Sequence, residues 1–452
     1  MTLLVITPDY ASHLLPLATL ATAWRDAGER VVVATGLATA PIVADFGFDR
    51  VDLPLGRGAN AGVMRTEEQD AAEAASLAGF FDATRHGMVP TLAYQARERL
   101  TDLMWRPEER AAATLDVVDR VRPDTILVDH LAFSARLALH TAGIEHGDVV
   151  LGHPSALPVA DEVYGYPPAW PSTFAPAAAE LADLRQLCDK VSDRFAQQWN
   201  AAARALDRDA VEVTDAFALH GDLVLYNYPA LLAAGDGRML PPHVFLGSTR
   251  RDERHDPEVD EFLRDDAPFV YVSFGSFLSV RADVLGRVAA AIARTGLRAA
   301  IAVGSTPASD LGSLPAGWLV REYLPQVRLL GAARLAITHG GNNSVTEAVG
   351  QGVPLLVLPF STDQFAGAAA VERSGTGLAL APNTATVDEL GEAITALADP
   401  SWPGREPLRT EAGAQHERPG PTLAYAALAS VSLTGEPAAS APAVIHGSPI
   451  PG

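Results

Sequence analysis

Short aliphatic and β-branched runs alternate with helical stretches in two parts of this chain, and this alternation most constrains its fold. In the first part the runs cover residues 3–7, 31–35, 125–129 and 148–152, and in the second 269–274, 298–303, 335–338 and 354–359. Strands that alternate with helices form parallel sheets, because each crossover helix returns the chain to the same end of the sheet. We therefore expect an α/β fold with two doubly wound domains.

A charged stretch separates the two parts. Residues 249–268 contain few large apolar side chains and suit a linker between domains with one helical turn. The length agrees, since 452 residues are too many for one compact core. We expect an N-terminal domain, a linker, a second domain, a last helix and a flexible tail, over residues 1–245, 246–268, 269–420, 421–435 and 436–452 respectively.

Composition excludes several classes of function. A net charge of −21 argues against binding to nucleic acid, which needs lysine and arginine to neutralise phosphates. The single cysteine, Cys188, can form neither an intramolecular disulfide nor a thiolate metal cluster. The sequence has no uninterrupted apolar run of about 18 residues and no basic leader before its first apolar run. We expect a cytoplasmic protein with no metal ion and no membrane partner.

Two of the expected strands lead into glycine turns that suit an anion. The run 269–274 continues into Gly275-Ser276, and the run 335–338 continues into His339, two glycines, two asparagines and Ser344. Ligands of open α/β sheets bind at the carboxyl ends of strands, where helix N-termini offer unpaired N–H groups to an anion. Alternatively, the glycines only make a tight turn, with Asn343 or Ser344 as the N-cap of the next helix.

The sequence around this second turn resembles a known donor-binding signature. Tyr323-Leu324-Pro325-Gln326, followed by THGGNNSVTEAVGQGVPLLVLPFSTDQ over residues 338–364, is similar to the signature of family 1 glycosyltransferases. That family includes plant UDP-glucosyltransferases, mammalian glucuronosyltransferases and bacterial antibiotic glycosyltransferases. Motif order and spacing agree over about 40 residues. The resemblance implies the GT-B fold, in which two Rossmann-like domains face each other across a cleft.

The resemblance also implies a role for each matched residue. Tyr323 is expected to stack on the base, with the backbone of Gln326 and Val327 at its edge, and Glu347 to hold the ribose. The diphosphate is expected among the turn residues Gly275, Ser276, His339, Gly341, Asn343 and Ser344. Asp363 and Gln364 are expected to bind hydroxyls of the transferred sugar, although Asp363 also suits the cap of a helix that begins near Phe365.

His13 is the candidate base that takes a proton from the acceptor hydroxyl. It follows the first expected strand, and we place it in a loop before a helix that starts near Pro16. An imidazole suits proton transfer near neutral pH, although a histidine before a helix is often only a loop residue. Family members carry Gly-His-x-x-Pro here; in this chain Ser12 replaces the glycine, and Glu29 replaces a later histidine.

Asp129 is the candidate partner that orients the imidazole of His13. The segment PDTILVDHLAFSARLA over residues 123–138 resembles the family segment that supplies this acid, and Asp129 is the matching position. Asp124 begins the same strand and is expected at the opposite edge of the sheet. Alternatively, Asp129 only caps the helix that follows its strand.

These residues together predict an inverting, metal-independent glycosyltransferase that uses a nucleotide sugar as co-substrate, with no further cofactor. UDP-glucose is the favoured donor, because Asn343-Ser344 and Asp363-Gln364 resemble members that use UDP-hexoses. A dTDP-deoxysugar donor is the alternative within the family. Nucleotide-sugar epimerases and lipid-linked sugar transferases share such domains but fit the signature poorly, and a catalytically silent partner protein would be expected to have lost His13 or the donor motif.

The acceptor is expected to be a small hydroxylated natural product, bound in the N-terminal domain. Its pocket is expected between helices in residues 60–110 and loops in 130–175, where aromatic and apolar side chains are candidates to line it: Phe80, Phe81, Met88, Phe133, Tyr164 and Trp170. The base lies in the first domain and the donor in the second, so the cleft is expected to close. Monomer and homodimer both remain open.

Overall fold

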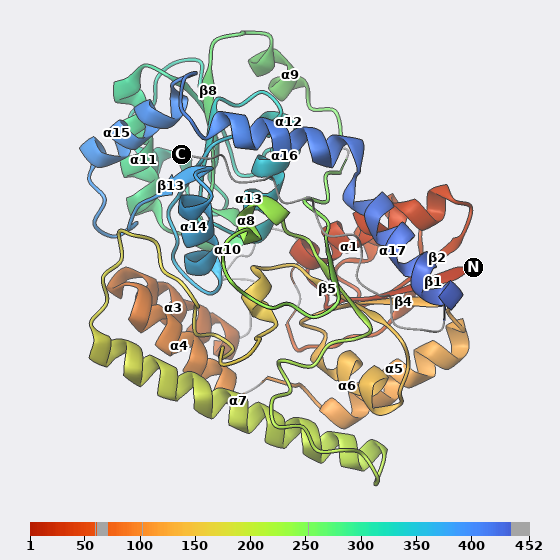
Figure 1. Cartoon of the computed structure of the whole chain (residues 1–452). Helices are drawn as coiled ribbons and strands as arrows, with labels where there is room; N and C mark the ends of the chain where they lie inside the picture. The colour runs from red at the N-terminus through yellow and green to blue at the C-terminus, as the bar shows by residue number, and fades with distance from the viewer. Residues whose placement is uncertain (59, 61–70, 102, 252, 435–452) are drawn as a thin grey trace, which may run out of the picture.

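Two parallel sheets form the framework of the chain, whose computed structural model describes residues 1–58, 60, 71–101, 103–251 and 253–434 (Figure 1). The first sheet has the strand order β3-β2-β1-β4-β5-β6-β7. Its strands are β1 (Thr2–Ile6), β2 (Arg30–Thr35), β3 (Asp49–Asp52), β4 (Thr125–Asp129), β5 (Gly147–Val150), β6 (Leu223–Tyr226) and β7 (His243–Phe245).

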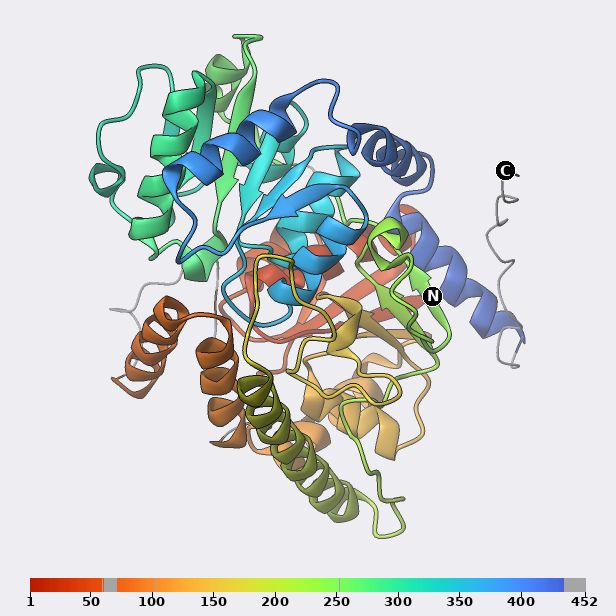
Figure 2. The ribbon, with the colours of Figure 1, turned by 60° about the vertical axis from the view of Figure 1, so that its left-hand side comes forward.

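Helices cover both faces of this sheet and extend to one side of it. They are α1 (Ala11–Asp26), α2 (Ala40–Asp45), α3 (Ala71–His86), α4 (Met88–Thr101), α5 (Pro107–Val121), α6 (Phe133–Thr141), α7 (Ala178–Leu206) and α8 (Ala230–Ala233). Helix α4 packs between α3 and α7. Of these three helices, α3 lies nearest the second sheet and α7 farthest from it (Figures 1 and 2). These three helices interrupt the strand–helix alternation.

The second sheet has the order β10-β9-β8-β11-β12-β13. Its strands are β8 (Phe269–Ser273), β9 (Arg298–Ala302), β10 (Leu319–Arg321), β11 (Leu335–Thr338), β12 (Leu355–Val357) and β13 (Gly377–Ala379). The helices of this half are α9 (Pro257–Leu263), α10 (Gly275–Leu278), α11 (Ala282–Thr295), α12 (Gln326–Leu330), α13 (Asn342–Gly350), α14 (Gln364–Arg373), α15 (Val387–Ala398) and α16 (Arg405–Glu417), followed by α17 (Gly420–Thr434). All the pairings in both sheets are parallel, as the alternation predicts.

Central strands of both sheets are buried on both faces, which explains their unbroken apolar sequences. Leu3, Leu4, Val5 and Ile6 of β1 are all fully buried, and Val270 and Val272 of β8 are too. A parallel strand covered by helices on both faces has no solvent side, so it lacks the alternation of polar residues. Burial of these side chains is the main favourable term in the stability of each half.

In each sheet the order in which successive strands are added reverses at one point. Both of these points face the cleft. In the first sheet β1 lies between β2 and β4, and in the second β8 lies between β9 and β11. Crevices at the carboxyl ends of such strands are where ligands of doubly wound folds bind. The ends of β1, β4, β8 and β11 lead to His13, Asp129, Gly275 and His339, respectively.

Helix α17 returns from the second half to the first (Figure 2). Its residues Ala424 and Leu428 pack in the same core cluster as Trp24 of α1. The ring centroid of Tyr425 lies 5.1 Å from that of Trp24, and its hydroxyl donates to Glu29 at 2.8 Å. The expected tail, residues 436–452, lies outside the described residues, and the domain boundaries stay predictions.

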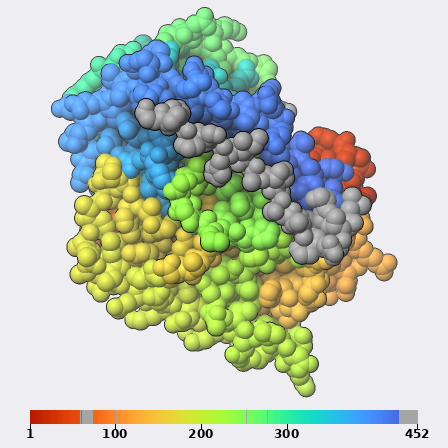
Figure 3. All heavy atoms as spheres, viewed as in Figure 1, coloured from red at the N-terminus to blue at the C-terminus, as the bar shows by residue number. Residues whose placement is uncertain are grey.

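The two halves also touch through side chains far from α17. Arg281, at the start of α11, is 2% exposed and donates to the backbone oxygen of Thr84 in α3 at 3.2 Å. Asn383 donates to the same oxygen at 2.8 Å. The loop between β5 and α7, yellow in Figure 3, reaches the second half, where Ser172 binds Glu372 of α14. In the described part of the chain, no helix combines the length and apolarity that a membrane span requires.

Candidate functional site

A cavity of about 690 Å³ lies between the two halves of the molecule. His13 and His130 line it from the first half, and His339, Ser344 and Asp363 line it from the second. Its walls therefore include the carboxyl ends of strands in both sheets. The candidate base and the candidate diphosphate turn, which are more than 300 residues apart in sequence, meet in one space.

His13 and Asp129 form a hydrogen-bonded pair at the switch point of the first sheet. His13 Nδ1 lies 2.7 Å from Asp129 Oδ2, with the Asp129 side chain fully buried and that of His13 18% exposed. The expected loop position of His13 is wrong, because α1 begins at Ala11 and His13 lies in its first turn. Tyr10, not a residue next to Pro16, is the N-cap, and Pro16 lies inside the helix.

The charges around this pair favour an ionised carboxylate beside a basic imidazole. Burial lowers the pKa of His13, but the charge and hydrogen bond of Asp129 and the charge of Asp363 together raise it above its ordinary value. Burial raises the pKa of Asp129, whereas the charge and hydrogen bond of His13 outweigh this and lower it. With Nδ1 held by Asp129, the other ring nitrogen of His13 remains to accept a proton.

His130 is a third member of this group that the sequence analysis missed. Its ring is stacked on that of His13 with 6.4 Å between the centroids, and its Nδ1 lies 3.4 Å from Asp129 Oδ1. Burial lowers the pKa of His130 to about 4. A neutral His130 therefore leaves His13 as the histidine of this pair that exchanges a proton near neutral pH. Its position directly after Asp129 is the only sequence signal for it.

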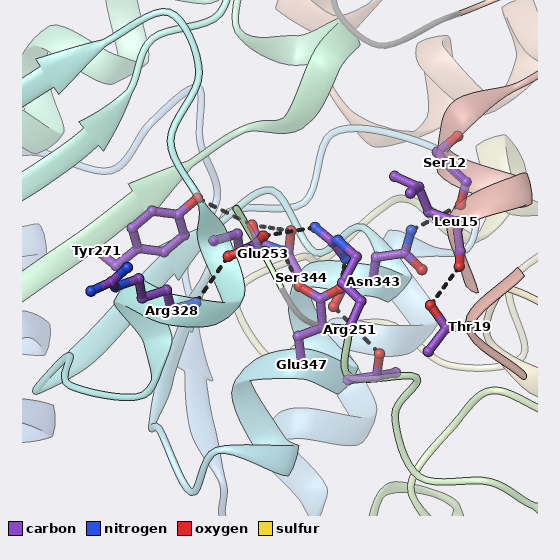
Figure 4. Close-up of polar contacts among 12 residues, drawn as sticks. Ser12, Leu15, Thr19, Arg251, Glu253, Tyr271, Arg328, Asn343, Ser344 and Glu347 are labelled. Carbon is purple, nitrogen blue, oxygen red and sulfur yellow. Dashed lines mark hydrogen bonds and ion pairs between the residues drawn. The ribbon is translucent and has the colours of Figure 1, made fainter. Parts of the chain in front are cut away.

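The backbone carbonyl of Ser12 connects the first turn of α1 with the second half of the molecule, because Pro16 leaves it free. Proline has no backbone N–H, so the carbonyl of Ser12, four residues earlier, has no helical donor. Asn343 Nδ2 donates to this carbonyl at 2.9 Å (Figure 4). The candidate diphosphate residue Asn343 thus bonds directly to the residue before the candidate base.

The expected diphosphate turn surrounds the N-terminus of α13. Gly341 is the N-cap, so neither Asn343 nor Ser344 has that role; both lie in the first turn. The ring of His339 lies between two glycines: a Cβ would come within 2.9 Å of this ring from Gly275 and 2.4 Å from Gly341. Burial lowers the pKa of His339 to about 4, so it is neutral and can donate one hydrogen bond. Ser276 lies in α10, and its side chain lies outside the described residues.

The residues expected at the base and ribose lie next to this turn. Gln326 Nε2 donates to Glu347 Oε2 at 2.7 Å, and Ser344 Oγ donates to Gln326 Oε1 at 3.2 Å (Figure 4). Tyr323 is 59% exposed, in contrast to most large apolar side chains of this half. Val327 begins α12 with Gln326, and its side chain is buried in the core.

Arg251, from the expected linker, is a further member that the sequence analysis missed. Its Nη1 lies 2.6 Å from Glu347 Oε1, and its Nη2 lies 3.1 Å from Glu253 Oε1 (Figure 4). Burial raises the pKa of Glu347, and the charge of Arg251 and the hydrogen bonds from Gln326 and Arg251 oppose that rise. Arg251 thus favours the ionised form of the candidate ribose ligand.

Asp363 and Gln364 line the cavity but differ in their partners. Asp363 is the N-cap residue of α14 without a side-chain cap bond; instead its Oδ2 accepts from the backbone N–H of His153 at 2.7 Å. Gln364 Oε1 accepts from the backbone N–H groups of Phe360 and Ser361 at 3.0 and 3.1 Å. The amide of Gln364 therefore holds the turn that presents Asp363.

The acceptor side of the cavity is only partly the one expected. Of the six expected side chains, Phe80 and Tyr164 line the cavity, whereas Met88 and Phe133 pack in the core around α7. Phe81 and Trp170 are not among the lining residues. Helix α4 lies in the expected helical region 60–110 and does form a wall, but its lining residues were not among the expected ones: Tyr94, Gln95, Glu98 and Arg99. Among the described residues there is no group of three or more histidine, cysteine or acidic side chains that could hold a metal ion.

Comparison with known proteins identifies relatives of this chain. Residues 185–406 match the model of the family described as UDP-glucoronosyl and UDP-glucosyl transferase. The NDP-glycosyltransferase YjiC of Bacillus subtilis is 32% identical over 147 residues, which are 32% of this chain and 38% of the relative. The matched segments span between a third and two fifths of the first curated relatives.

Solved structures are similar over nearly the whole chain. The spinosyn forosaminyltransferase SpnP has a TM-score of 0.65 and 19% identity, with 96% of this chain and 99% of that chain covered. The glycosyltransferase VinC in complex with dTDP has a TM-score of 0.64 and 18% identity, with the same coverage. These findings confirm the GT-B fold and the resemblance to family 1 glycosyltransferases.

Proposed function

We propose that this chain, similar to family 1 glycosyltransferases in sequence and fold, transfers a hexose from a nucleotide diphosphate sugar to a hydroxyl of a small acceptor. The observation that carries the proposal is the shared cavity, in which the His13–Asp129 pair faces the N-terminus of α13. A base and an anion site on opposite walls are what displacement of a diphosphate by a hydroxyl requires.

The donor is proposed to lie along the second half. Its base stacks on Tyr323, with the backbone of Gln326 and Val327 at its edge, and its ribose hydroxyls donate to Glu347. Its diphosphate lies at the N-terminus of α13, where backbone N–H groups and the second amide hydrogen of Asn343 donate to it. The hydroxyl of Ser344 turns from Gln326 to the diphosphate, and the ring of His339 lies beside it. Asp363 accepts from hydroxyls of the sugar, and Gln364 holds the turn and has one further amide hydrogen for the sugar.

Transfer is proposed to proceed in one step with inversion. The acceptor oxygen attacks the anomeric carbon while the bond from that carbon to the diphosphate oxygen breaks. The acceptor proton moves to the free ring nitrogen of His13, and the charge of the resulting imidazolium is balanced by Asp129. The nucleoside diphosphate leaves with its charge stabilised by donors of the second half, which needs no metal ion.

UDP-glucose is the proposed donor, and a dTDP-deoxysugar is the second candidate. Glu347 favours UDP, because a carboxylate held between Gln326 and Arg251 can accept from the 2′-hydroxyl that dTDP lacks. The second candidate is favoured by the similarity to VinC, whose structure contains dTDP. The discriminating group is therefore the ribose 2′-hydroxyl.

Isothermal titration of UDP and of dTDP, each in the presence of EDTA, tests the donor proposal. UDP is expected to bind about 10- to 100-fold more tightly, since one hydrogen bond to a charged group is worth about 1.5–3 kcal/mol. Tighter binding of dTDP would replace UDP-glucose with the second candidate. Binding of neither to a folded sample would overturn the glycosyltransferase proposal.

His13→Ala tests the base. The variant is expected to bind UDP as the parent does but to lose about 10²–10⁴-fold in kcat with a UDP-hexose and an accepted acceptor. His86→Ala is the matched control, because His86 is exposed on α3 and, among the described residues, pairs with the side chain and backbone of Asp82 alone. Unchanged turnover of His13→Ala would remove the proposed base. Parent protein that binds UDP but transfers no sugar would favour a catalytically silent partner protein.

A further inference from the structure

The inner face of α4 connects the sugar end of the cavity with its acceptor end. Gln95 Oε1 accepts from the backbone N–H of Thr362 at 3.2 Å, directly before the candidate sugar ligand Asp363. Arg99 lies four residues later, and residues at this spacing are neighbours on one helix face. Arg99 therefore lies one helical turn beyond the sugar end, and both residues line the cavity.

The guanidinium of Arg99 is held in place by its neighbours. It lies over the ring of Tyr164, 5.1 Å from the centroid, and this ring stacks on Phe217 with 3.8 Å between centroids and 7° between planes. Gly165 has φ +83°, and a Cβ there would come within 2.6 Å of Arg99 Nη1. The glycine thus leaves the space that this nitrogen needs.

Arg99 has no carboxylate partner within the described part of the chain, nor any hydrogen bond there. Two more deeply buried arginines of this half differ: Arg136 pairs with Asp148 at 2.8 Å, and Arg238 with Glu162 at 2.6 Å. Among the described residues that line the cavity, Arg99 is the only lysine or arginine. Partial burial removes some of the water that would otherwise solvate the guanidinium. A bound anion that accepts from its unused N–H donors therefore lowers the free energy of this cation.

The charges next to Arg99 leave it available for such an anion. The neighbouring Glu98 is exposed and accepts from Ser76 Oγ at 2.6 Å. Asp363, the other acidic residue that lines the cavity, is bound to the backbone of His153. The diphosphate site belongs to the second half, at the N-terminus of α13, whereas Arg99 belongs to α4 of the first half.

We propose that Arg99 determines acceptor specificity by binding a carboxylate of the acceptor, whose hydroxyl then reaches His13. This inference rests on the proposed function and names the acceptor class: hydroxylated carboxylic acids with an apolar body. A guanidinium binds a carboxylate through two parallel hydrogen bonds, which fixes orientation as well as position. Phe80 and Tyr164 supply the apolar contacts for the body between the two polar ends.

Matched pairs of hydroxynaphthoic acids and their methyl esters test the proposal, with hydroxyl and carboxylate at several separations. Dissociation constants are measured by isothermal titration with the full chain, without donor. At least one acid is expected to bind about 10- to 100-fold more tightly than its ester, as for a hydrogen bond to a charged group. Arg99→Met should abolish this preference by weakening the acid alone, and Arg99→Lys should retain part of it.

Arg97→Met is the matched control, because Arg97 is exposed on the same helix and does not line the cavity. It should keep the full preference for the acid. Thermal unfolding of each variant shows that it is folded, and UDP titration shows that the donor site is intact. The proposal is overturned if no acid is preferred to its ester, or if Arg99→Met keeps the preference. Failure of UDP to bind would instead overturn the proposed function and leave the acid preference measurable.

Discussion

At the scale of single residues, the two oxygens of the Asp129 carboxylate bind two different groups. Its Oδ2 binds His13, and its Oδ1 accepts from the backbone N–H of Leu131 at 2.9 Å. The capping interpretation is wrong, because the N-cap of α6 is Ala132 and no side chain caps this helix; Leu131 belongs to the turn before it. The bond to Leu131 also fixes the carboxylate plane, so the imidazole of His13 is held in one orientation.

Asp129→Asn is expected to shift the pH dependence of transfer. In the parent, kcat/KM should fall as pH drops through the pKa of His13, which lies above the ordinary 6.5. The neutral amide removes the charge that raises this pKa, while burial still lowers it, so the acid limb should move to lower pH. Activity should also fall by about 10²-fold or more, since an amide can hold the wrong tautomer. A pH–rate profile whose acid limb stays in place would contradict the assignment.

Arg251→Met is expected to weaken UDP binding by about 10-fold, equivalent to about 1.4 kcal/mol. Loss of the nearby charge leaves burial less opposed, so the pKa of Glu347 rises further and its neutral form accepts less strongly from ribose. Binding should therefore weaken more steeply as pH falls than it does in the parent. Titration of UDP across pH checks this, with the exposed Arg254→Met as the control. Equal affinities and equal pH slopes would contradict it.

Individual elements show which parts of the fold the sequence can reveal. The strands beside the site were predicted because buried parallel strands are unbroken apolar runs. The missed strands β3, β7, β10 and β13 are the edges of the two sheets, and β3 and β7 are only partly buried. Edge strands such as Asp49–Asp52 carry polar residues, so composition does not distinguish them from loops. The buried strand β6 is the exception. It was not predicted, and it follows the long helix α7 in the sequence.

The candidate site likewise contains residues that the sequence predicts and residues that it does not. Its donor side was predicted because residues 323–364 form one contiguous motif, and each turn follows directly from its strand. Arg251 and Arg99 come from segments that carry no motif, and His130 lies in the segment 123–138 but is not the position that the resemblance matched. Their relation to the site depends on how the linker, β4 and α4 pack, which single-chain patterns do not encode.

The turn before α14 yields a prediction about stability. Gln364→Ala leaves the backbone N–H groups of Phe360 and Ser361 without their acceptor in a buried place. The free energy of unfolding should fall by about 1–3 kcal/mol for each group left unsatisfied. Gln364→Glu, which keeps the accepting oxygen, should retain most of the stability. Urea unfolding of both variants measures the difference, and equal midpoints would contradict the role of Gln364 in the turn.

At the scale of the whole molecule, the two halves are in contact through α3. Arg281 is stacked on Phe360 and bonded to Thr84, Asp283 and Asn383, so it joins α3 to the second half. Phe80 of the same helix packs against the core of that half. Helix α3 therefore belongs to the first half by sequence and is fixed to the second by its contacts.

Arg281→Met is expected to favour a more open molecule. It removes the charged donors that bind Thr84, each worth about 1.5–3 kcal/mol, while keeping apolar contact with Phe360. Small-angle scattering should show a larger radius of gyration than the parent has. Arg294→Met is the control, since Arg294 is exposed at the other end of α11 and pairs with Asp388. A scattering curve identical to that of the parent would show that Arg281 does not hold the halves together.

The return of α17 to the first half limits how the two halves can move. The chain crosses between them before β8 and again before α17, and both crossings lie together: a Cβ on Gly420 would come within 2.9 Å of the carbonyl oxygen of Leu246. Two bodies joined at one place keep rotational degrees of freedom but lose translation along their interface. Displacement then grows with distance from Gly420, so any rotation that separates α3 from α11 must break the contact between Arg281 and Thr84.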